Sequence, residues 1–261
     1  SRGLGDVYKR QDIYILLIMV ALQQSQDLIV FSDHKILPKF SNQNQQSIYS
    51  ILYNNGTYPL WLINKIINDD ADNTKYNFTV SSFINNNKFM KQNIKPSNNV
   101  NVDFIDLTLS LQATDISTIV DTKYKNITKK EGNILVLEQP ELLLSSVESL
   151  TTINLFQQFI NKLLLSKFQH VIIVSNIDYY STYINSFHQY QYTSFYQSLQ
   201  YKSDVLFTVK PLKTGFAKDI SGTLTITKGG ADNSHYTDKV KVVENEYFFF
   251  VNKDSSVKLF Y

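Results

Sequence analysis

The sequence contains no cysteine, and this absence removes several classes of function at once. Disulfides, zinc sites built on thiolates and thiol nucleophiles are all excluded, and we expect a reduced intracellular compartment. The GxSxG and HExxH motifs are also missing, and the histidines lack the spacing of a metal site. These are His34, His170, His188 and His235. The sequence therefore predicts no metal and no cofactor.

Long hydrophobic runs are missing too. The run "IYILLIMVAL" at residues 13–22 is ten residues long, whereas a membrane-spanning helix needs about 20. Its length also fits a signal-peptide core, but no clear small-residue cleavage site follows. The preceding "GLGDVYKRQ" resembles a translated sequencing adapter. We interpret residues 1–18 as upstream read-through, Met19 as the natural start, and residues 19–261 as one domain with no membrane segment.

Charge of either sign is scarce overall. The net charge is +2, the pI is about 8.4, and 43% of the residues are hydrophobic. Such a chain can bury a sizeable core, but it is not a polycation. Any contact with nucleic acid must therefore come from a local patch.

Alternating strand and helix patterns fill the first two thirds of the chain. "NILVLEQP" (133–140) and "HVIIVSN" (170–176) are continuous apolar runs, as expected for strands buried on both faces. Between them, apolar residues recur every three to four positions: Ile153, Phe156, Phe159, Ile160, Leu163 and Leu164. A strand, an amphipathic helix and a second strand predict a βαβ unit and a parallel sheet. Further strands are predicted at 27–31, 48–53, 76–84 and 100–107, with a helix at about 60–68 and a polar connection at 85–100.

The last third changes character. An aromatic stretch at 178–201 is typical of a helix, and "DVLFTVKPLKTGFAKDISGTLTITKGG" predicts strand, turn and strand. "ENEYFFFVN" adds another strand. Antiparallel strands that close a parallel sheet suit one RecA-like α/β domain, with a mostly parallel central sheet, flanking helices and C-terminal antiparallel hairpin strands.

The junction after the strand at 48–53 is where a P-loop, GxxxxGK[ST], would lie. Counting from Gly56, the Gly, Lys and Ser/Thr positions hold Trp61, Leu62 and Ile63, so the phosphate-binding lysine and the metal-binding hydroxyl are absent. Pro59 removes one backbone N–H from the loop. The sequence predicts a degenerate P-loop without ATPase chemistry.

Glu138 ends the apolar strand "ILVLE", where a Walker B carboxylate would bind magnesium. The simpler interpretation is that Glu138 ends the strand, while Pro140 and Glu141 start the next helix. Asn176 and Asp178 follow the next strand and could imitate a phosphate sensor, but a solvated loop is the favoured interpretation.

Long segments of the chain resemble the Elongator complex protein 6 family. They are "DLIVFSDHKILP", "YPLWLINKI", "IKPSNNVNVDFIDL", "NILVLEQPELLLSSVESLT", "VKPLKTGFAKDISGTLTITKGGA" and "VVENEYFFFVNKDSSVKLFY". They occur in the same order from about residue 26 to 261. The resemblance implies a non-catalytic RecA-like subunit, a pseudo-ATPase in the cytoplasm and the nucleus. It also implies a heterohexameric ring with two sister RecA-like subunits, which helps the catalytic Elongator core to bind tRNA for wobble-uridine modification.

Lysines around the predicted C-terminal hairpin are the candidate RNA contacts. From Lys202 to Lys228 there are five lysines against two aspartates, a local excess of +3. Lys213 and Lys218 lie near the predicted tip, and Lys228 precedes two glycines. Glycines beside lysines let ammonium groups approach phosphates, although a solvated hairpin is the alternative for any single lysine.

Three functions remain open at this stage. The first is an inert ring subunit that helps to bind tRNA, the second is a purely structural ring subunit, and the third retains nucleotide binding. The aromatic residues at 179–201 could stack on bases, but an interface or a core is favoured. The tail "VKLFY" is expected to add apolar surface for such an interface.

Overall fold

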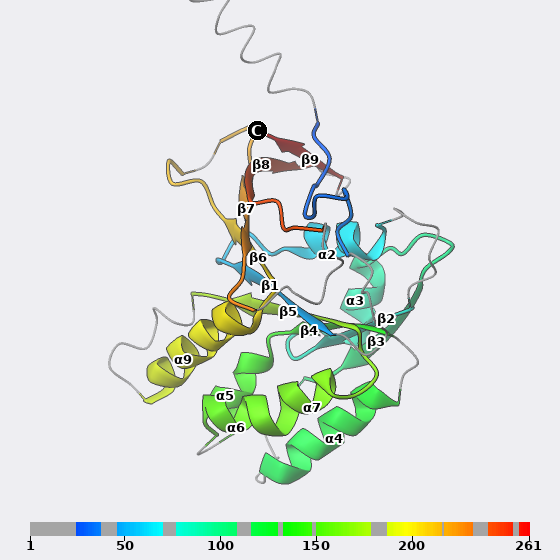
Figure 1. The fold of residues 1–261 in the computed structure, drawn as a ribbon, viewed down its shortest axis with the longest axis vertical. Coiled ribbons are helices and arrows are strands. Elements are labelled where there is room, and N and C mark those ends of the chain that lie inside the picture. The colour runs from blue at the N-terminus through cyan, green and yellow to red at the C-terminus, as the bar shows by residue number, and fades with distance from the viewer. Residues whose placement is uncertain are drawn as a thin grey trace, which may run out of the picture.

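The computed structural model describes ten segments of the chain: residues 25–37, 46–69, 77–108, 116–129, 133–147, 150–178, 187–215, 217–231, 240–252 and 256–261. Within them a single nine-stranded sheet has the order β3-β2-β4-β5-β1-β6-β7-β8-β9 (Figure 1). The strands are β1 (Ser47–Tyr53), β2 (Asn77–Ser82), β3 (Asn101–Asp106), β4 (Ile134–Glu138), β5 (His170–Asn176), β6 (Val205–Lys210), β7 (Gly222–Lys228), β8 (Asn245–Val251) and β9 (Val257–Phe260).

Six strands, β1 to β6, run parallel, and β7 to β9 continue the sheet antiparallel. Every residue of β1, β4 and β5 is buried, because helices or other segments cover both faces of these central strands. The predicted architecture, a mostly parallel sheet with C-terminal antiparallel strands, is confirmed.

Helices cover both faces of the sheet. They are α2 (Leu60–Ile67), α3 (Asn87–Asn93), α4 (Ile116–Thr128), the 3₁₀ turn η1 (Pro140–Leu142), α5 (Leu143–Ser146), α6 (Thr152–Leu155), the π-helical turn η2 (Phe156–Ile160), α7 (Asn161–Leu164) and α9 (Phe187–Lys202). Figure 1 shows α2 and α3 on one side of the parallel strands and α4 to α7 with α9 on the other. The buried side chains accordingly form two clusters, one on each face.

The N-terminal segment 25–37 differs from its prediction as a strand. It forms only an isolated bridge, between Phe31 and Val242. Val30 and Phe31 are nevertheless fully buried against the α2 face. The apolar run "LIVF" reflects burial with a single bridge rather than a full strand, and a pattern of hydrophobicity cannot distinguish the two.

Two helices lie where none was predicted. The polar connection contains α3, and α4 follows β3. The helix predicted between β4 and β5 is present, but its middle turn, η2, is π-helical. A π-helical turn contains one residue more than an α-helical turn, so it rotates the residues on one side of it relative to those on the other. As a result, Ile153 is 64% exposed although the 3.6-residue period predicts burial.

The N-terminal predictions fall outside the described residues. These are the read-through at 1–18, the start at Met19 and the apolar run at 13–22. No helix within the described segments is long and apolar enough to cross a membrane.

Candidate functional site

The carboxyl ends of the parallel strands meet at one edge of the sheet, which is where ligands bind in open α/β folds. The register aligns Tyr53 of β1 with Asn176 of β5, and Ser82 of β2 with Glu138 of β4. The loop at residues 54–59 leaves β1 at this edge. We call this loop, together with Glu138, Glu141, Asn176 and Asp178 beside it, the carboxyl edge.

The loop itself is a tight turn. Gly56 has a φ of +83°, which only glycine adopts without strain, and the N–H of Thr57 donates to the carbonyl of Asn54 at 3.1 Å. After Pro59, helix α2 begins at once. The loop therefore has the strand–turn–helix form expected of a P-loop position.

The three positions that the sequence predicts to be degenerate P-loop positions face the core rather than the loop. Trp61, Leu62 and Ile63 are all buried, in the cluster beneath α2. The Trp61 ring lies 4.9 Å from the ring of Phe249 in β8, measured between centroids. Apolar side chains thus occupy the positions at which the sequence comparison with GxxxxGK[ST] expects a lysine and a hydroxyl.

Asp178 ties the loop to the neighbouring strand end. Its two carboxylate oxygens accept hydrogen bonds from the side-chain amide of Asn54 and the backbone N–H of Asn55, each at 2.5 Å. Asn176 is buried, and its side-chain amide donates to the side-chain oxygen of Asn55 at 2.8 Å. The favoured prediction of a solvated loop at Asn176 and Asp178 is wrong for this reason. The two residues fasten the loop from the side.

Glu138, at the end of β4, also binds the same loop through Tyr58. Its side chain is 3% exposed and accepts hydrogen bonds from the hydroxyls of Tyr58 and Ser82 and, at 2.9 Å, from the amide of Asn85. Burial, followed by the charge of Glu138, raises the pKa of Tyr58, so that hydroxyl stays protonated and donates. The carboxylate is fully engaged within the chain.

Glu141 is a third acid of this region, and its burial was not predicted. Gln139 adopts a left-handed conformation (φ +51°), and Pro140 then starts η1, as predicted. The turn places Glu141 fully inside, where it accepts from the Ser175 hydroxyl and the Asn176 N–H, both at 3.1 Å. Burial raises the pKa of Glu141 to about 8.

Chemically, the carboxyl edge is closed on itself. No group of three or more His, Cys, Asp or Glu residues in the described segments could hold a metal ion. Each of the three acids accepts hydrogen bonds from neighbouring strand ends or from the loop. The arrangement stabilises the loop, and the carboxylate of Asp178 adds negative charge beside it.

The lysines of the C-terminal hairpin separate into two places. Lys213 and Lys218 are exposed at the β6–β7 turn, beside Gly215 (φ +89°). Lys228 ends β7, opposite Val205. Six residue steps separate Lys228 from Gly222 at the tip, which is roughly 20 Å along the strand. Lys213 and Lys218 therefore lie on the same turn, whereas Lys228 lies at the other end of β7.

The aromatic helix α9 combines core and surface. Tyr192 and Phe195 are buried, whereas Phe187, Tyr190 and Tyr201 are 54%, 70% and 76% exposed. The other aromatic candidates, at 179, 180 and 183, lie outside the described residues. The tail matches its prediction only in part, because Tyr261 is 55% exposed whereas Leu259 and Phe260 of β9 are buried.

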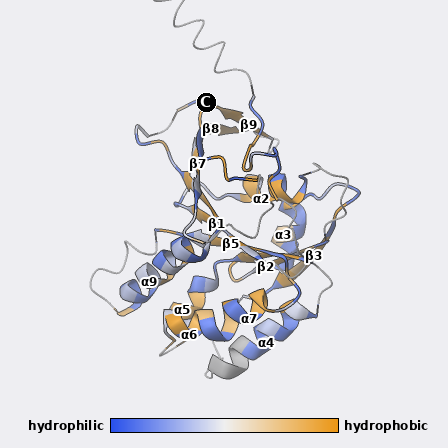
Figure 2. Ribbon diagram, viewed as in Figure 1, coloured by the Kyte–Doolittle hydropathy of each residue, from blue (hydrophilic) through white to orange (hydrophobic). Residues whose placement is uncertain are grey.

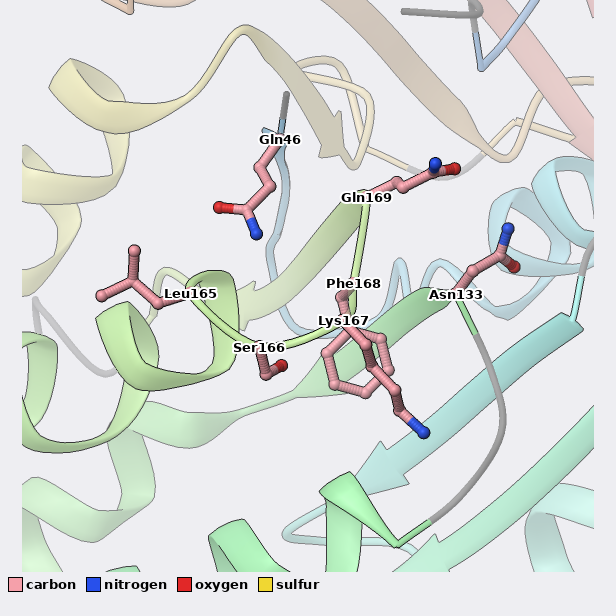
Figure 3. A pocket seen from close by; sticks show the side chains of 7 residues that line it. All are labelled: Gln46, Asn133, Leu165, Ser166, Lys167, Phe168 and Gln169. Atoms are coloured by element: carbon pink, nitrogen blue, oxygen red, sulfur yellow. The ribbon is translucent and has the colours of Figure 1, made fainter. Parts of the chain in front are cut away.

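A hollow of about 520 Å³ lies at the opposite, amino end of the strands. It is lined by Gln46, Asn133, Leu165, Ser166, Lys167, Phe168 and Gln169. Figure 3 shows the polar side chains pointing in different directions, with Gln46 on one side and Asn133 and Gln169 on the other. A ligand site needs convergent polar groups, and this hollow does not supply them.

Comparisons with known proteins show that the chain is similar in sequence to a curated protein. No family model matches it. Elongator complex protein 6 of Saccharomyces cerevisiae is 34% identical over 270 residues, which cover 91% of this chain and 98% of the yeast protein.

Two solved structures are similar at low identity. A KaiC-like protein of Pyrococcus horikoshii OT3 is 8% identical with a TM-score of 0.48, over 86% of this chain and all of that one. The flagellar accessory protein FlaH of Methanocaldococcus jannaschii is 12% identical with a TM-score of 0.47, over 82% and 88%. Both scores lie below 0.5, and the architecture rests on the chain's own strand order.

Proposed function

Because the chain belongs to the Elongator complex protein 6 family, we propose that it is a non-catalytic RecA-like subunit of Elongator. It forms a heterohexameric ring with two sister RecA-like subunits. The ring helps the catalytic core to bind tRNA for wobble-uridine modification, in the cytoplasm and the nucleus. The observation that carries the proposal is identity to the yeast subunit along nearly the whole of both chains.

The carboxyl edge supports the non-catalytic part of the proposal. A phosphate at the loop would need the N–H of Asn55, which already donates to Asp178. It would also meet the negative charge of that carboxylate, and no lysine stands at position 62 to offset the repulsion. A buried tryptophan and two buried aliphatic side chains occupy the positions that would hold the ligand set.

The lysines at the hairpin tip support a contact with tRNA. Lys213 and Lys218 are exposed on a turn that the rest of the sheet holds in place. Exposed ammonium groups on a projecting turn can reach a phosphate backbone without any change in the core. Lys228 lies at the other end of β7, so its contribution to RNA binding is tested separately.

A structural role without RNA contacts is the second candidate. The exposed aromatic side chains of α9, Phe187, Tyr190 and Tyr201, favour it because such side chains are enriched at protein interfaces. In that case the sister subunits alone would contact the RNA.

One experiment separates these candidates. The chain is co-expressed with its two sister subunits, the ring composition is measured by native mass spectrometry, and tRNA affinity by fluorescence anisotropy at several salt concentrations. We expect two copies of each subunit. Lys213→Glu with Lys218→Glu should leave the ring intact, weaken tRNA binding and lower the salt slope by about one to two units.

The same measurement on Lys228→Glu tests the separate lysine. A smaller loss than that of the tip pair is expected, because one contact contributes at most about one unit of slope. If neither variant changes affinity or slope, the structural role replaces the RNA-binding role. A stable monomer that joins neither sister would contradict the ring.

A further inference from the structure

The stretch between Asp72 and Asp103 has an unusual charge pattern. Its thirty residues contain no acid and four lysines, at positions 75, 88, 91 and 95. Three of these lysines lie on α3 or directly after it. Figure 2 shows α3 as predominantly hydrophilic, in contrast to the mixed colouring of α2 beside it.

Helix α3 is firmly seated despite this composition. The side chain of Asn86 caps its start by accepting the N–H of Phe89 at 2.9 Å. Met90 and Ile94, four residues apart on one face, are 2% and 3% exposed and belong to the α2-side core. The opposite face is therefore held outward in a fixed orientation.

Two asparagines of the neighbouring helix region hold the chain after α3. Asn64 of α2 donates to the carbonyl of Asn93 at 2.9 Å and accepts the N–H of Lys95 at 2.9 Å. Asn68 donates to the carbonyl of Lys95 at 3.0 Å and accepts the N–H of Ser97 at 2.7 Å. Both backbone groups of Lys95 are thus bound by side chains from α2 and its C-cap, and its side chain extends from a fixed backbone.

The outward face carries positive charge that the described part of the chain does not neutralise. Lys88, Lys91 and Lys95 are exposed, and no described carboxylate lies within ion-pair distance of their ammonium groups. Phe89 stands among them with 37% of its surface exposed. Asp69, which follows the C-cap of α2, accepts the N–H of Ile36 at 2.9 Å.

We propose that this surface, formed by Lys88, Phe89, Lys91 and Lys95 and called here the α3 shelf, binds the sugar–phosphate backbone of RNA. The inference rests on the proposed function and adds a second RNA contact to the one at the hairpin tip. Cations without counter-charges favour a polyanion, and a half-exposed aromatic ring among them offers a stacking surface for a base. An acidic protein that packs against Phe89 is the alternative occupant, and the test below distinguishes it from RNA.

The test uses the co-expressed ring and anisotropy with a fluorescent tRNA and with a single-stranded RNA of the same length. In the shelf variant, Lys88, Lys91 and Lys95 are each replaced by Gln. A matched control replaces Lys125, Lys129 and Lys167, which are exposed on the other side of the sheet. Both variants lose three charges, so any difference between them reports position rather than net charge.

We expect the shelf variant to bind RNA at least about tenfold more weakly than the control, with a salt slope lower by roughly two units. Phe89→Leu keeps every charge, so it should weaken single-stranded RNA binding about fivefold with an unchanged slope. The two readouts separate charge from stacking.

Each contrary result has a distinct meaning. If the parent ring binds no RNA, the proposed function itself fails. If the parent and the hairpin-tip pair behave as expected but the shelf variant matches its control, the α3 inference is wrong. If the shelf variant keeps its RNA affinity and instead loses a protein from the assembly, the surface is a protein interface and the inference is again wrong.

A measurement on the unmodified ring covers a variant that fails to assemble. Ultraviolet crosslinking to RNA, followed by mass spectrometry, should recover crosslinks within residues 88–95. Crosslinks elsewhere in this chain with none in that segment would overturn the inference.

Discussion

The carboxyl edge and the α3 shelf are neighbours in the fold, yet they treat charge in opposite ways. At the carboxyl edge, Glu138 and Glu141 are buried, Asp178 is partly buried, and all three accept hydrogen bonds from the chain. On the shelf, the lysines are turned outward and no described carboxylate pairs with them. Buried acids of this kind are held by hydrogen bonds that belong to the fold, whereas exposed charge without a counter-charge is available to a ligand. Mutations at the two places should therefore have separable effects.

The largest effect on stability is expected from Glu138→Ala. The change leaves the hydroxyls of Tyr58 and Ser82 and the amide of Asn85 without their acceptor in a buried site. We expect the free energy of unfolding to fall by about 3 kcal/mol, measured by urea denaturation. The three-lysine shelf variant is the contrast and should stay within about 0.5 kcal/mol of the parent.

Glu138→Gln sharpens the same comparison. Its shape is kept, so stability should fall less, and any ATP turnover of the ring should be unchanged because the residue holds a loop rather than a metal. Loss of turnover in this variant, with the ring intact, would contradict the closed carboxyl edge and restore an enzymatic role.

A pH-dependent effect of intermediate size is expected from Glu141. Its pKa is raised to about 8 from an ordinary value of 4.5, so between these values the folded chain holds a proton that the unfolded chain has released. Stability should therefore fall as pH rises through this window, by at most about 1.4 kcal/mol per pH unit. Glu141→Gln cannot titrate and should flatten the slope, as measured by urea midpoints at pH 5.5, 6.5 and 7.5. Parallel slopes for parent and variant would contradict the raised pKa.

The smallest effect is expected from Asp178→Ala, because Asp178 is only partly buried. Loss of its bond to Asn55 should reduce stability by about 1 kcal/mol and increase hydrogen exchange at the Asn55 amide severalfold. Neither parent nor variant should bind Mg-ATP, since the lysine and the hydroxyl remain absent. Nucleotide binding gained by the variant would show that Asp178 alone blocks the loop.

How far the sequence predicts this molecule depends on the range of the interactions involved. The strands β4 and β5 were predictable because their apolar runs carry the signal locally. The hydrogen bonds of Asp178 to the loop were not, because its partners lie more than 120 residues away in the sequence. The burial of Glu141 depends likewise on Ser175 and Asn176, from another strand. A polar residue gives no local sign of such partners.

The helix α3 is an intermediate case. Asn86 at its start and the apolar pair Met90 and Ile94, four residues apart, are recognisable helix signals. They are hidden in an asparagine-rich stretch that resembles a loop by composition. The position of Lys228 illustrates another limit, since the sequence places it near Lys218 while a seven-residue strand carries it away from the tip.

The central position of β1 has a consequence for how the chain comes to be folded. Its two neighbours in the sheet are β5 and β6, so Ser47 pairs with His170, and Tyr49 with Val205. During synthesis β1 emerges early and must wait, unpaired, for more than 120 further residues before its first neighbour exists. Closing such long loops slows folding and leaves a strand of seven residues without its neighbours in the meantime. The strands β2 and β3, separated by a single short helix, need no such delay and can pair earlier.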